Sequence, residues 1–221
     1  MAGQCPACGT TEVMLVVVPG VILAGGRSRR MGRAKAFLPI GTSGETFVSR
    51  LVRILRDGGV DDVLVVAAGD GDVMREALRA ESVLSRLVLN SEPDRGQLSS
   101  LQVGLRAIDH PGVWGMLVTL VDVPLVSAET VRALLEVHRR TRAPVVRPIR
   151  HGRHGHPVIF DRAVFDELRG ADPRVGAKAV VRAHGADAVA VEVDDEGAFL
   201  DIDTPDDYSR VFKQPVPDEL V

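Results

Sequence analysis

A run of glycines and cations between residues 20 and 35 is the part of the sequence best suited to hold a phosphate. The apolar residues 21–23 predict a buried strand, and Gly25 and Gly26 after it let the backbone turn with its N–H groups facing outward. No Asp or Glu occurs between this turn and Glu45, whereas cations are dense: Arg27, Arg29, Arg30, Arg33 and Lys35. A polyphosphate is the simplest ligand for bare amides beside so much positive charge.

The spacing of the stretch excludes two common phosphate-binding loops. A P-loop ends in Gly-Lys-Ser/Thr, but Gly32 is followed by Arg33 and Ala34, and the dinucleotide fingerprint Gly-x-Gly-x-x-Gly is also missing. Residues 23–35 instead resemble the signature L-A-(A/G)-G-x-S-x-R-M-G-x-x-K of the MobA/MocA-like nucleotidyltransferases, and every fixed position matches. The alternative is a glycine-rich turn whose arginines are solvated.

The resemblance implies which residues of the loop serve which purpose. Arg30 and Lys35 would act in catalysis by balancing the charge of the transferring group. The nucleotide would be held by Leu23, Ala24, Gly25, Gly26, Arg27, Ser28 and Lys35. The implied reaction moves a nucleoside monophosphate from a nucleoside triphosphate to a phosphorylated acceptor, molybdopterin, and releases pyrophosphate. Two alternatives stay open: the same reaction on a sugar or polyol phosphate, and a non-catalytic nucleotide-binding maturation factor for a molybdenum enzyme.

Two aspartates are candidate metal ligands. Asp122 comes directly after the most hydrophobic strand expected, residues 114–121, and ligands of parallel sheets lie beyond the carboxyl ends of strands. Asp122 is therefore expected to be catalytic and to bind Mg²⁺, with Mn²⁺ as an alternative, because these ions prefer carboxylate oxygens. The stretch 201–207 reads Asp-x-Asp-Thr-Pro-x-Asp, and the resemblance makes Asp203 the second ligand. The structural alternative for both aspartates is capping of a nearby helix or a turn.

Three polar residues after the third expected strand complete the implied nucleotide site. The family pattern matches at Asn90, Gly96 and Ser100-Leu101, and it implies that Asn90, Ser99 and Ser100 serve the nucleotide. The hydroxyls of Ser99 and Ser100 would then lie near the base or ribose. An equally good interpretation of Ser99 is that it caps the following helix.

A second basic stretch, residues 137–160, contains six arginines and no acidic residue. Within it Gly155-His156-Pro157 resembles an element of the cytidylyl branch of the family, which implies that Gly155 and His156 line the acceptor pocket. A histidine between Gly and Pro is otherwise more typical of an ordinary loop. His151 and His154 are interpreted as surface residues.

The sequence gives conflicting signals about the donor nucleotide. Gly25-Gly26 resembles the guanylyl branch, whereas the two residues between Gly32 and Lys35, together with the Gly155-His156-Pro157 element, resemble the cytidylyl branch. The guanylyl signal at Gly25 amounts to the absence of one methyl group, and a difference of that size discriminates weakly between ligands. The spacing and the Gly155-His156-Pro157 element therefore outweigh it, and we expect CTP to be favoured over GTP.

Composition limits the class of protein. The 221 residues are 45% hydrophobic with a net charge of −3, which favours a globular protein and argues against a nucleic-acid partner. The apolar run 13–24 is too short to span a bilayer, so no membrane partner is expected. Cys5 and Cys8 lack a second ligand pair for zinc. A chain with only these two cysteines is consistent with a protein of the reducing cytoplasm. We expect a mobile leader at residues 1–12, a single nucleotidyltransferase domain at 13–214 and a C-terminal tail at 215–221.

The elements that must position these residues alternate between strand and helix. Apolar runs predict strands at 20–24, 63–68, 86–89, 114–121 and 188–193. Helical spacing predicts helices at 46–57, 72–80, 128–139, 162–168 and 175–184. Strands that are apolar throughout are buried on both faces, which is typical of parallel sheets covered by helices. The predicted fold is α/β, a three-layer α/β/α Rossmann-like nucleotidyltransferase fold with a mainly parallel sheet.

Overall fold

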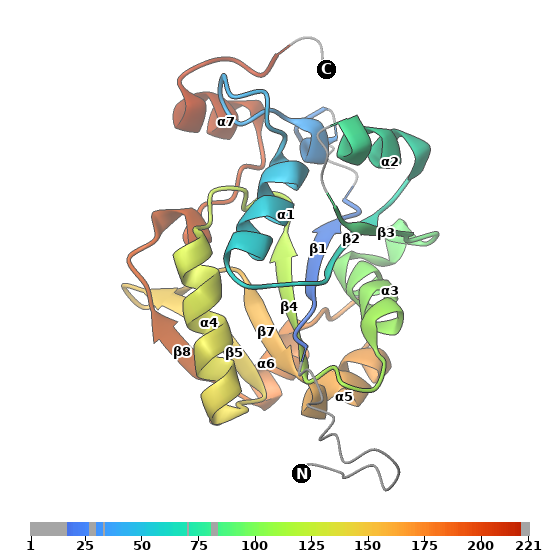
Figure 1. Ribbon diagram of the computed structural model, residues 1–221, viewed down its shortest axis with the longest axis vertical. Helices are drawn as coiled ribbons and strands as arrows, with labels where there is room; N and C mark the ends of the chain where they lie inside the picture. The colour runs from blue at the N-terminus through green and yellow to red at the C-terminus, as the bar shows by residue number, and fades with distance from the viewer. Residues whose placement is uncertain (1–16, 27–29, 33, 70, 81–83, 218–221) are drawn as a thin grey trace, which may run out of the picture.

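The computed structural model describes residues 17–26, 30–32, 34–69, 71–80 and 84–217, and it shows a central sheet with helices on both faces (Figure 1). Within these residues the sheet has eight strands. They are β1 (Gly20–Ala24), β2 (Val63–Ala67), β3 (Arg86–Leu89), β4 (Gly115–Leu120), β5 (Val145–Arg150), β6 (Arg153–His154), β7 (Val158–Asp161) and β8 (Val189–Glu192).

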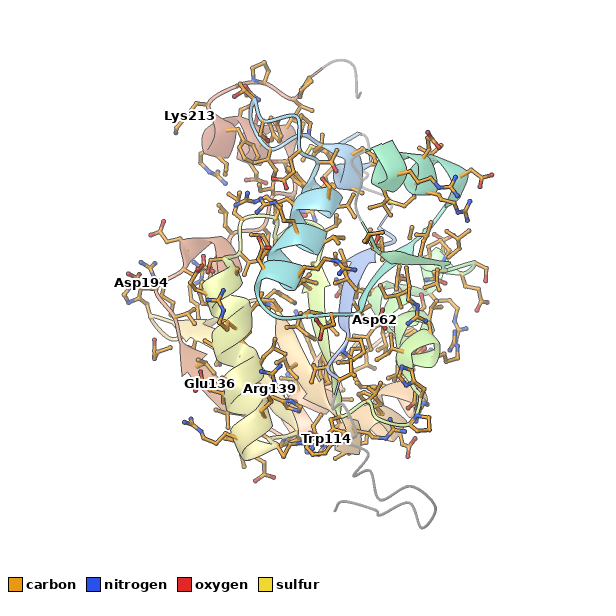
Figure 2. The ribbon with its side chains drawn as sticks, in the orientation of Figure 1. Asp62, Trp114, Glu136, Arg139, Asp194 and Lys213 are labelled. Carbon is orange, nitrogen blue, oxygen red and sulfur yellow. The ribbon has the colours of Figure 1, made fainter. Side chains whose placement is uncertain are left out.

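The strand order is β3-β2-β1-β4-β7-β5-β6, with β8 paired to β5. β1 pairs in parallel with both β2 and β4, whereas β7 runs antiparallel to β4 and to β5. The end of β4 therefore lies at the same edge of the sheet as the start of β7. Trp114, which precedes β4, lies at the lower end of the molecule in Figure 2, and Lys213, which follows the last helix, lies at the upper end.

The helices form two layers. The apolar core on one face of the sheet draws on α1, α2, α4 and α7, and the core on the other face draws on α3, α5 and α6. The helices are α1 (Phe47–Asp57), α2 (Gly71–Ala80), α3 (Gln97–Ile108), α4 (Ala128–Thr141), α5 (Phe165–Gly170), α6 (Lys178–Ala183) and α7 (Pro205–Phe212). Short 3-10 turns occur at η1 (Lys35–Phe37), η2 (Pro93–Arg95), η3 (Arg162–Val164) and η4 (Glu196–Phe199).

Local sequence explains where the main helices begin and end. Thr46 caps α1 through a capping box with Ser49, and the helix ends at Gly58. Thr204 caps α7 in the same way with Asp207, and Pro205 occupies the first helical position, where its missing N–H costs nothing. The first turn of α7, which directly follows Asp203, is thus fixed by its own residues.

The expected fold class is confirmed, and most elements lie where the sequence places them. The strands at 20–24 and 86–89 match to the residue, and the helix expected at 128–139 continues to Thr141. The helix expected at 162–168 was wrong in part, because it begins as the 3-10 turn η3, and the one at 175–184 is shortened to α6. Strands β5 and β6 were not expected, because arginines and Pro148 interrupt the apolar pattern there.

Some expectations lie outside the described residues. These are the leader at 1–12 with Cys5 and Cys8, and the last four residues of the expected tail at 215–221. In the part of the chain that the structure describes, no helix is long and apolar enough to cross a bilayer.

Candidate active site

A cavity of about 330 Å³ opens at the edge of the sheet where β1 and β4 end. Gly25 and Gly26 form one wall directly after β1, and Asp122 lies opposite, after β4. Ser100 of α3 contributes a hydroxyl, and Asp203 reaches the cavity from the segment before α7. Segments far apart in the sequence therefore meet at the carboxyl ends of parallel strands, as is usual for ligand sites in open α/β sheets.

Two cations and two carboxylates form a network in this cavity. Lys35 Nζ lies 3.2 Å from Asp122 Oδ2 and also contacts Asp203 Oδ1. Arg30 Nη2 lies 2.7 Å from Asp203 Oδ2, and its side chain is 71% exposed, whereas that of Lys35 is only 9% exposed. The hydrogen bond from Lys35, together with the charges of Lys35 and Arg30, lowers the pKa of Asp203, so this carboxyl is ionised at neutral pH.

Asp122 has an oxygen that no described residue satisfies. Its Oδ1 is buried and has no hydrogen-bond partner in the described part of the chain. The capping alternative for Asp122 was wrong, because α4 is capped by Ser127, whose hydroxyl accepts the N–H of Thr130 at 3.2 Å. Asp195 supports that cap by accepting the N–H of Ser127 at 2.8 Å. The carboxylate of Asp122 is thus not used to end or start a helix.

The carboxylate of Asp203 is also independent of the neighbouring helix cap. Thr204 and Asp207 satisfy the first turn of α7 between them, and Asp203 contributes only its backbone N–H, which donates to Asp207 Oδ2 at 3.2 Å. The backbone N–H of Ile202 donates to the carbonyl of Asp122 at 2.8 Å. This bond ties the two loops that carry the candidate metal ligands.

These residues fit a divalent cation that is shared with a phosphate. The described residues contain no group of three or more His, Cys, Asp or Glu side chains suited to hold a metal. Mg²⁺ nevertheless needs only one or two protein carboxylates when phosphates and waters supply the other ligands. The orphaned oxygen of Asp122 and the ionised carboxylate of Asp203 meet that need.

Asp201 is a third carboxylate that sequence reasoning did not assign. Burial and the nearby charges of Asp122 and Asp203 raise its pKa. The signal was present in the sequence, because Asp201 is the first acid of the Asp-x-Asp pattern that contains Asp203. The charges of Lys35 and Arg153 oppose this rise in pKa but do not cancel it.

The expected polar residues after β3 separate into two groups. Ser100 lines the cavity, whereas Asn90 and Ser99 do not. Asn90 is buried, and its side-chain amide forms hydrogen bonds with Ser99, Ser100 and the backbone of Glu92. Ser99 does not cap α3, because the residue at the cap is Gly96; the Ser99 hydroxyl instead donates to the Gly96 carbonyl at 2.7 Å.

The two expected acceptor residues lie beside the cavity rather than in its wall. Gly155 packs against the backbone, where a Cβ would come within 2.2 Å of the Ala198 carbonyl oxygen. His156 donates its N–H to that same carbonyl at 2.8 Å. Burial lowers the pKa of the His156 imidazole, against an opposing effect of the nearby Asp122 charge. His156 is therefore close enough to Asp122 to sense its charge.

The remaining expected residues lie in or near the loop after β1. Leu23 lines the main cavity with Gly25 and Gly26, and Ala24 lines a neighbouring, mainly apolar cavity of about 240 Å³. Arg27 and Ser28 lie outside the described residues.

Comparisons with known proteins agree with this geometry. The MobA-like NTP transferase domain matches residues 20–189. The chain is 30% identical over 200 residues to the purine catabolism protein PucB of Bacillus subtilis (strain 168), covering 87% of this chain and 94% of that protein. It is 36% identical over 129 residues to a probable molybdenum cofactor guanylyltransferase of Opitutus terrae, covering 58% of this chain and 59% of the relative.

Solved structures show the same architecture. Rv0371c from Mycobacterium tuberculosis H37Rv superposes with a TM-score of 0.73 at 30% identity, covering 90% of this chain and 98% of that one. A complex of Rv0371C with manganese has a TM-score of 0.67 at 27% identity, covering 90% of this chain and 99% of that one. With the family match over most of its length, the chain belongs to the MobA-like NTP transferase domain family, and it is a nucleotidyltransferase.

Proposed function

We propose that the protein transfers a nucleoside monophosphate from a nucleoside triphosphate to the phosphate of a molybdopterin-type acceptor and releases pyrophosphate. The observation that carries the proposal is the position of Lys35, held by Asp122 and Asp203 at a cavity walled by Gly25 and Gly26. Relatives named as molybdenum cofactor guanylyltransferases support the choice of acceptor.

In the proposed reaction the protein mainly positions the two substrates and neutralises the negative charge of their phosphates. An oxygen of the acceptor phosphate attacks the α-phosphorus, and the bond from that phosphorus to the bridging oxygen of the β-phosphate breaks, so pyrophosphate leaves with its electron pair. No general base is needed, because a phosphate is already ionised at neutral pH. Lys35 and Arg30 would stabilise the charge of the transition state, and the backbone at Gly25 and Gly26 would approach the phosphates closely.

We propose Asp122 and Asp203 as the residues that hold a divalent cation. When bound, Mg²⁺ or Mn²⁺ neutralises phosphate charge and helps to orient the triphosphate. The manganese complex of a structural relative supports a divalent metal of this kind. Gly155 and His156 are proposed to border the acceptor, since they belong to the second basic stretch and precede β7, which pairs with β4 on the side away from β1.

CTP is our proposed donor, on the spacing from Gly32 to Lys35 and on the Gly155-His156-Pro157 element. GTP is the second candidate, supported by Gly25-Gly26 and by the relatives named as guanylyltransferases. Both donors would use the same phosphate grip, so the choice depends on the base-binding side of the cavity.

Pyrophosphate release tests the proposal when it is measured with each of the four nucleoside triphosphates, without an acceptor, with molybdopterin, and with a sugar or polyol phosphate in place of molybdopterin. Release that requires both molybdopterin and CTP is the expected result. Release only with GTP contradicts the donor, release only with a sugar or polyol phosphate contradicts the acceptor, and nucleotide binding without any release supports a non-catalytic role.

Gly25→Ala tests whether the glycine loop governs the choice of base. A Cβ at Gly25 would lie 2.8 Å from Ser100 Oγ, so the methyl group must narrow the cavity or displace that hydroxyl. We expect the larger guanine to suffer more, which raises the ratio of kcat/KM for CTP to that for GTP severalfold. A ratio equal to that of the wild type would remove the loop from donor selection.

A further inference from the structure

The side-chain amide of Asn90 is fixed in one orientation. Its Oδ1 accepts the backbone N–H of Glu92 at 2.9 Å, and its Nδ2 lies 2.8 Å from Ser99 Oγ and 2.9 Å from Ser100 Oγ. A backbone N–H can only donate, so the amide oxygen must face Glu92 and the amide hydrogens must face the two serines. Both serine hydroxyls therefore act as acceptors toward Asn90.

The two serines differ in where their own hydrogens go. Ser99 donates to the carbonyl of Gly96 at 2.7 Å, with the carbonyl of Glu92 at 3.1 Å as a second acceptor. Among the residues that the structure describes, none accepts the hydroxyl hydrogen of Ser100. A hydroxyl that already accepts from Asn90 keeps one hydrogen to give, and in a buried setting an unused donor is costly.

Ser100 presents that unused hydrogen at the cavity. The residue is only 4% exposed, yet it lines the cavity that contains Lys35 and Asp122. Gly25 lies against it, since a Cβ there would come within 2.8 Å of Ser100 Oγ. Asn90 itself does not line the cavity, although it is equally buried at 4% exposure.

We infer that Asn90 is a positioning residue: it acts through Ser100, the hydroxyl that the family resemblance assigns to the nucleotide, and does not itself touch the nucleotide. The inference rests on the proposed function, because it takes this cavity as the nucleotide site. By giving its hydrogen to Ser100 Oγ, Asn90 directs the hydroxyl hydrogen into the cavity. The base and the ribose of a nucleoside triphosphate both carry oxygen or nitrogen acceptors for such a donor.

Calorimetric titration with non-hydrolysable α,β-methylene analogues of CTP and GTP tests both roles. Ser100→Ala is expected to weaken the better-bound analogue roughly fivefold to tenfold, the usual effect of one neutral hydrogen bond. Asn90→Asp should weaken binding to a similar degree, because an ionised carboxylate has no hydrogen to give and would take the one that Ser100 donates. Asn90→Ala repeats the test without adding a charge. Ser99→Ala is the matched control, since Ser99 also accepts a hydrogen bond from Asn90 but does not line the cavity. The affinity of this variant for the analogue should stay within about twofold of the wild type.

The decisive result is whether the two sites are coupled. In a Ser100→Ala background both Asn90 substitutions should leave the affinity unchanged, whereas independent sites would add their effects. In turnover, KM for the nucleotide should rise with kcat unchanged, because the bond is made equally before and during reaction. A wild-type protein that binds neither analogue contradicts the proposed function. A wild type that binds, with Ser100→Ala binding equally well or with additive effects of the Asn90 variants, overturns this inference alone.

Discussion

Asp122 follows the end of β4 and Asp161 ends the neighbouring antiparallel strand β7, so the two acids lie at opposite ends of these strands. They use their oxygens differently. Asp161 Oδ1 accepts the N–H of Ala163 at 3.0 Å, and its Oδ2 lies 2.9 Å from His138 Nε2 and 2.8 Å from Arg142 Nε. Asp122 meets Lys35 with one oxygen and leaves the other without a partner in the described residues. The side chain of Asp161 is 5% exposed and that of Asp122 is 24% exposed.

The difference separates an acid whose oxygens are used within the fold from an acid that we propose as a metal ligand. Each oxygen of Asp161 is occupied, so Asp161, His138 and Arg142 form a cluster that is closed at the carboxylate and joins α4 to the end of β7. The other ring nitrogen of His138, Nδ1, is buried and has no hydrogen-bond partner among the described residues. The network around Asp122 is open, since Asp122 lines the cavity and its Oδ1 has no partner among the described residues. Buried polar groups are normally satisfied, and one that is not calls for an explanation, which the proposed cation would supply.

The largest expected effect is on stability at the closed cluster. Asp161→Ala removes the shared acceptor of the buried His138 and the partly exposed Arg142, and breaking a buried pair such as Asp161 with His138 costs about 3–5 kcal/mol. Urea unfolding of the variant and the wild type measures the difference. A loss of free energy of unfolding below about 1 kcal/mol would contradict the structural role given to Asp161.

The next effect is on catalysis at the open network. Asp122→Asn keeps the shape of the side chain but removes the negative charge, and we expect turnover to fall roughly 10²-fold or more. The free energy of unfolding should stay near that of the wild type, because the charge is only partly paired. Asp161→Asn is the matched control at the opposite end of these strands and should retain turnover within about threefold. Full turnover of a folded Asp122→Asn protein would remove Asp122 from the reaction.

The closed cluster should also make stability depend on pH. Burial works to raise the pKa of Asp161, but hydrogen bonds from His138, Arg142 and the Ala163 backbone outweigh it and lower the pKa to about 2 from its usual 3.8. A carboxyl with a depressed pKa in the folded state stabilises the protein above its unfolded pKa and loses that contribution as the pH falls through the folded pKa. We expect up to about 2 kcal/mol to be lost between pH 4 and pH 2 from this group.

Unfolding measured across that range in wild type and Asp161→Asn isolates the contribution. The variant cannot titrate at residue 161, so its curve should be flatter by the same amount. Two curves of equal slope would show that the acid loss of stability comes from other carboxyls.

The open network could be predicted from the sequence and the closed cluster could not. Lys35, Asp122 and Asp203 stand in recognisable local contexts, which are a glycine-rich signature, the end of an apolar strand and a helix-capping pattern. The structure brings them together although Lys35 and Asp203 are 168 residues apart. Asp161 and His138 have no such context, because one ends a strand and the other lies on an ordinary amphipathic helix 23 residues away.

The directions in which the hydroxyls of Ser99 and Ser100 form hydrogen bonds also could not be predicted from the sequence. Ser99 and Ser100 are adjacent and identical, and only the start of α3 at Gln97 decides that one hydroxyl faces the Gly96 carbonyl and the other faces the cavity. Strand β5 was missed for a related reason. It pairs with β6, β7 and β8, but Arg147, Pro148 and Arg150 interrupt the apolar run that marks a central strand.

The smallest expected effect concerns an aromatic ring at the rim of the closed cluster. The guanidinium of Arg142 lies 4.0 Å from the ring centroid of Trp114 and also bonds Asp161, so the ring packs against a cation of the cluster. Trp114 is labelled at the lower end of the molecule in Figure 2, and it is 37% exposed. A cation–π contact at an exposed site is worth about 0.5–1 kcal/mol, and Trp114→Leu should lower the free energy of unfolding by about that amount without changing kcat/KM.

Arg30→Gln is the opposite case at the open network, because its pair with Asp203 is solvent-exposed and such pairs contribute about 0–1 kcal/mol. We expect Arg30→Gln to slow turnover while the midpoint of unfolding stays within a degree or two.

A double-mutant cycle of Trp114→Leu with Arg142→Gln completes the test of the aromatic ring. A coupling energy near zero would mean that the ring does not hold the arginine, and that the cluster depends on His138 and Asp161 alone.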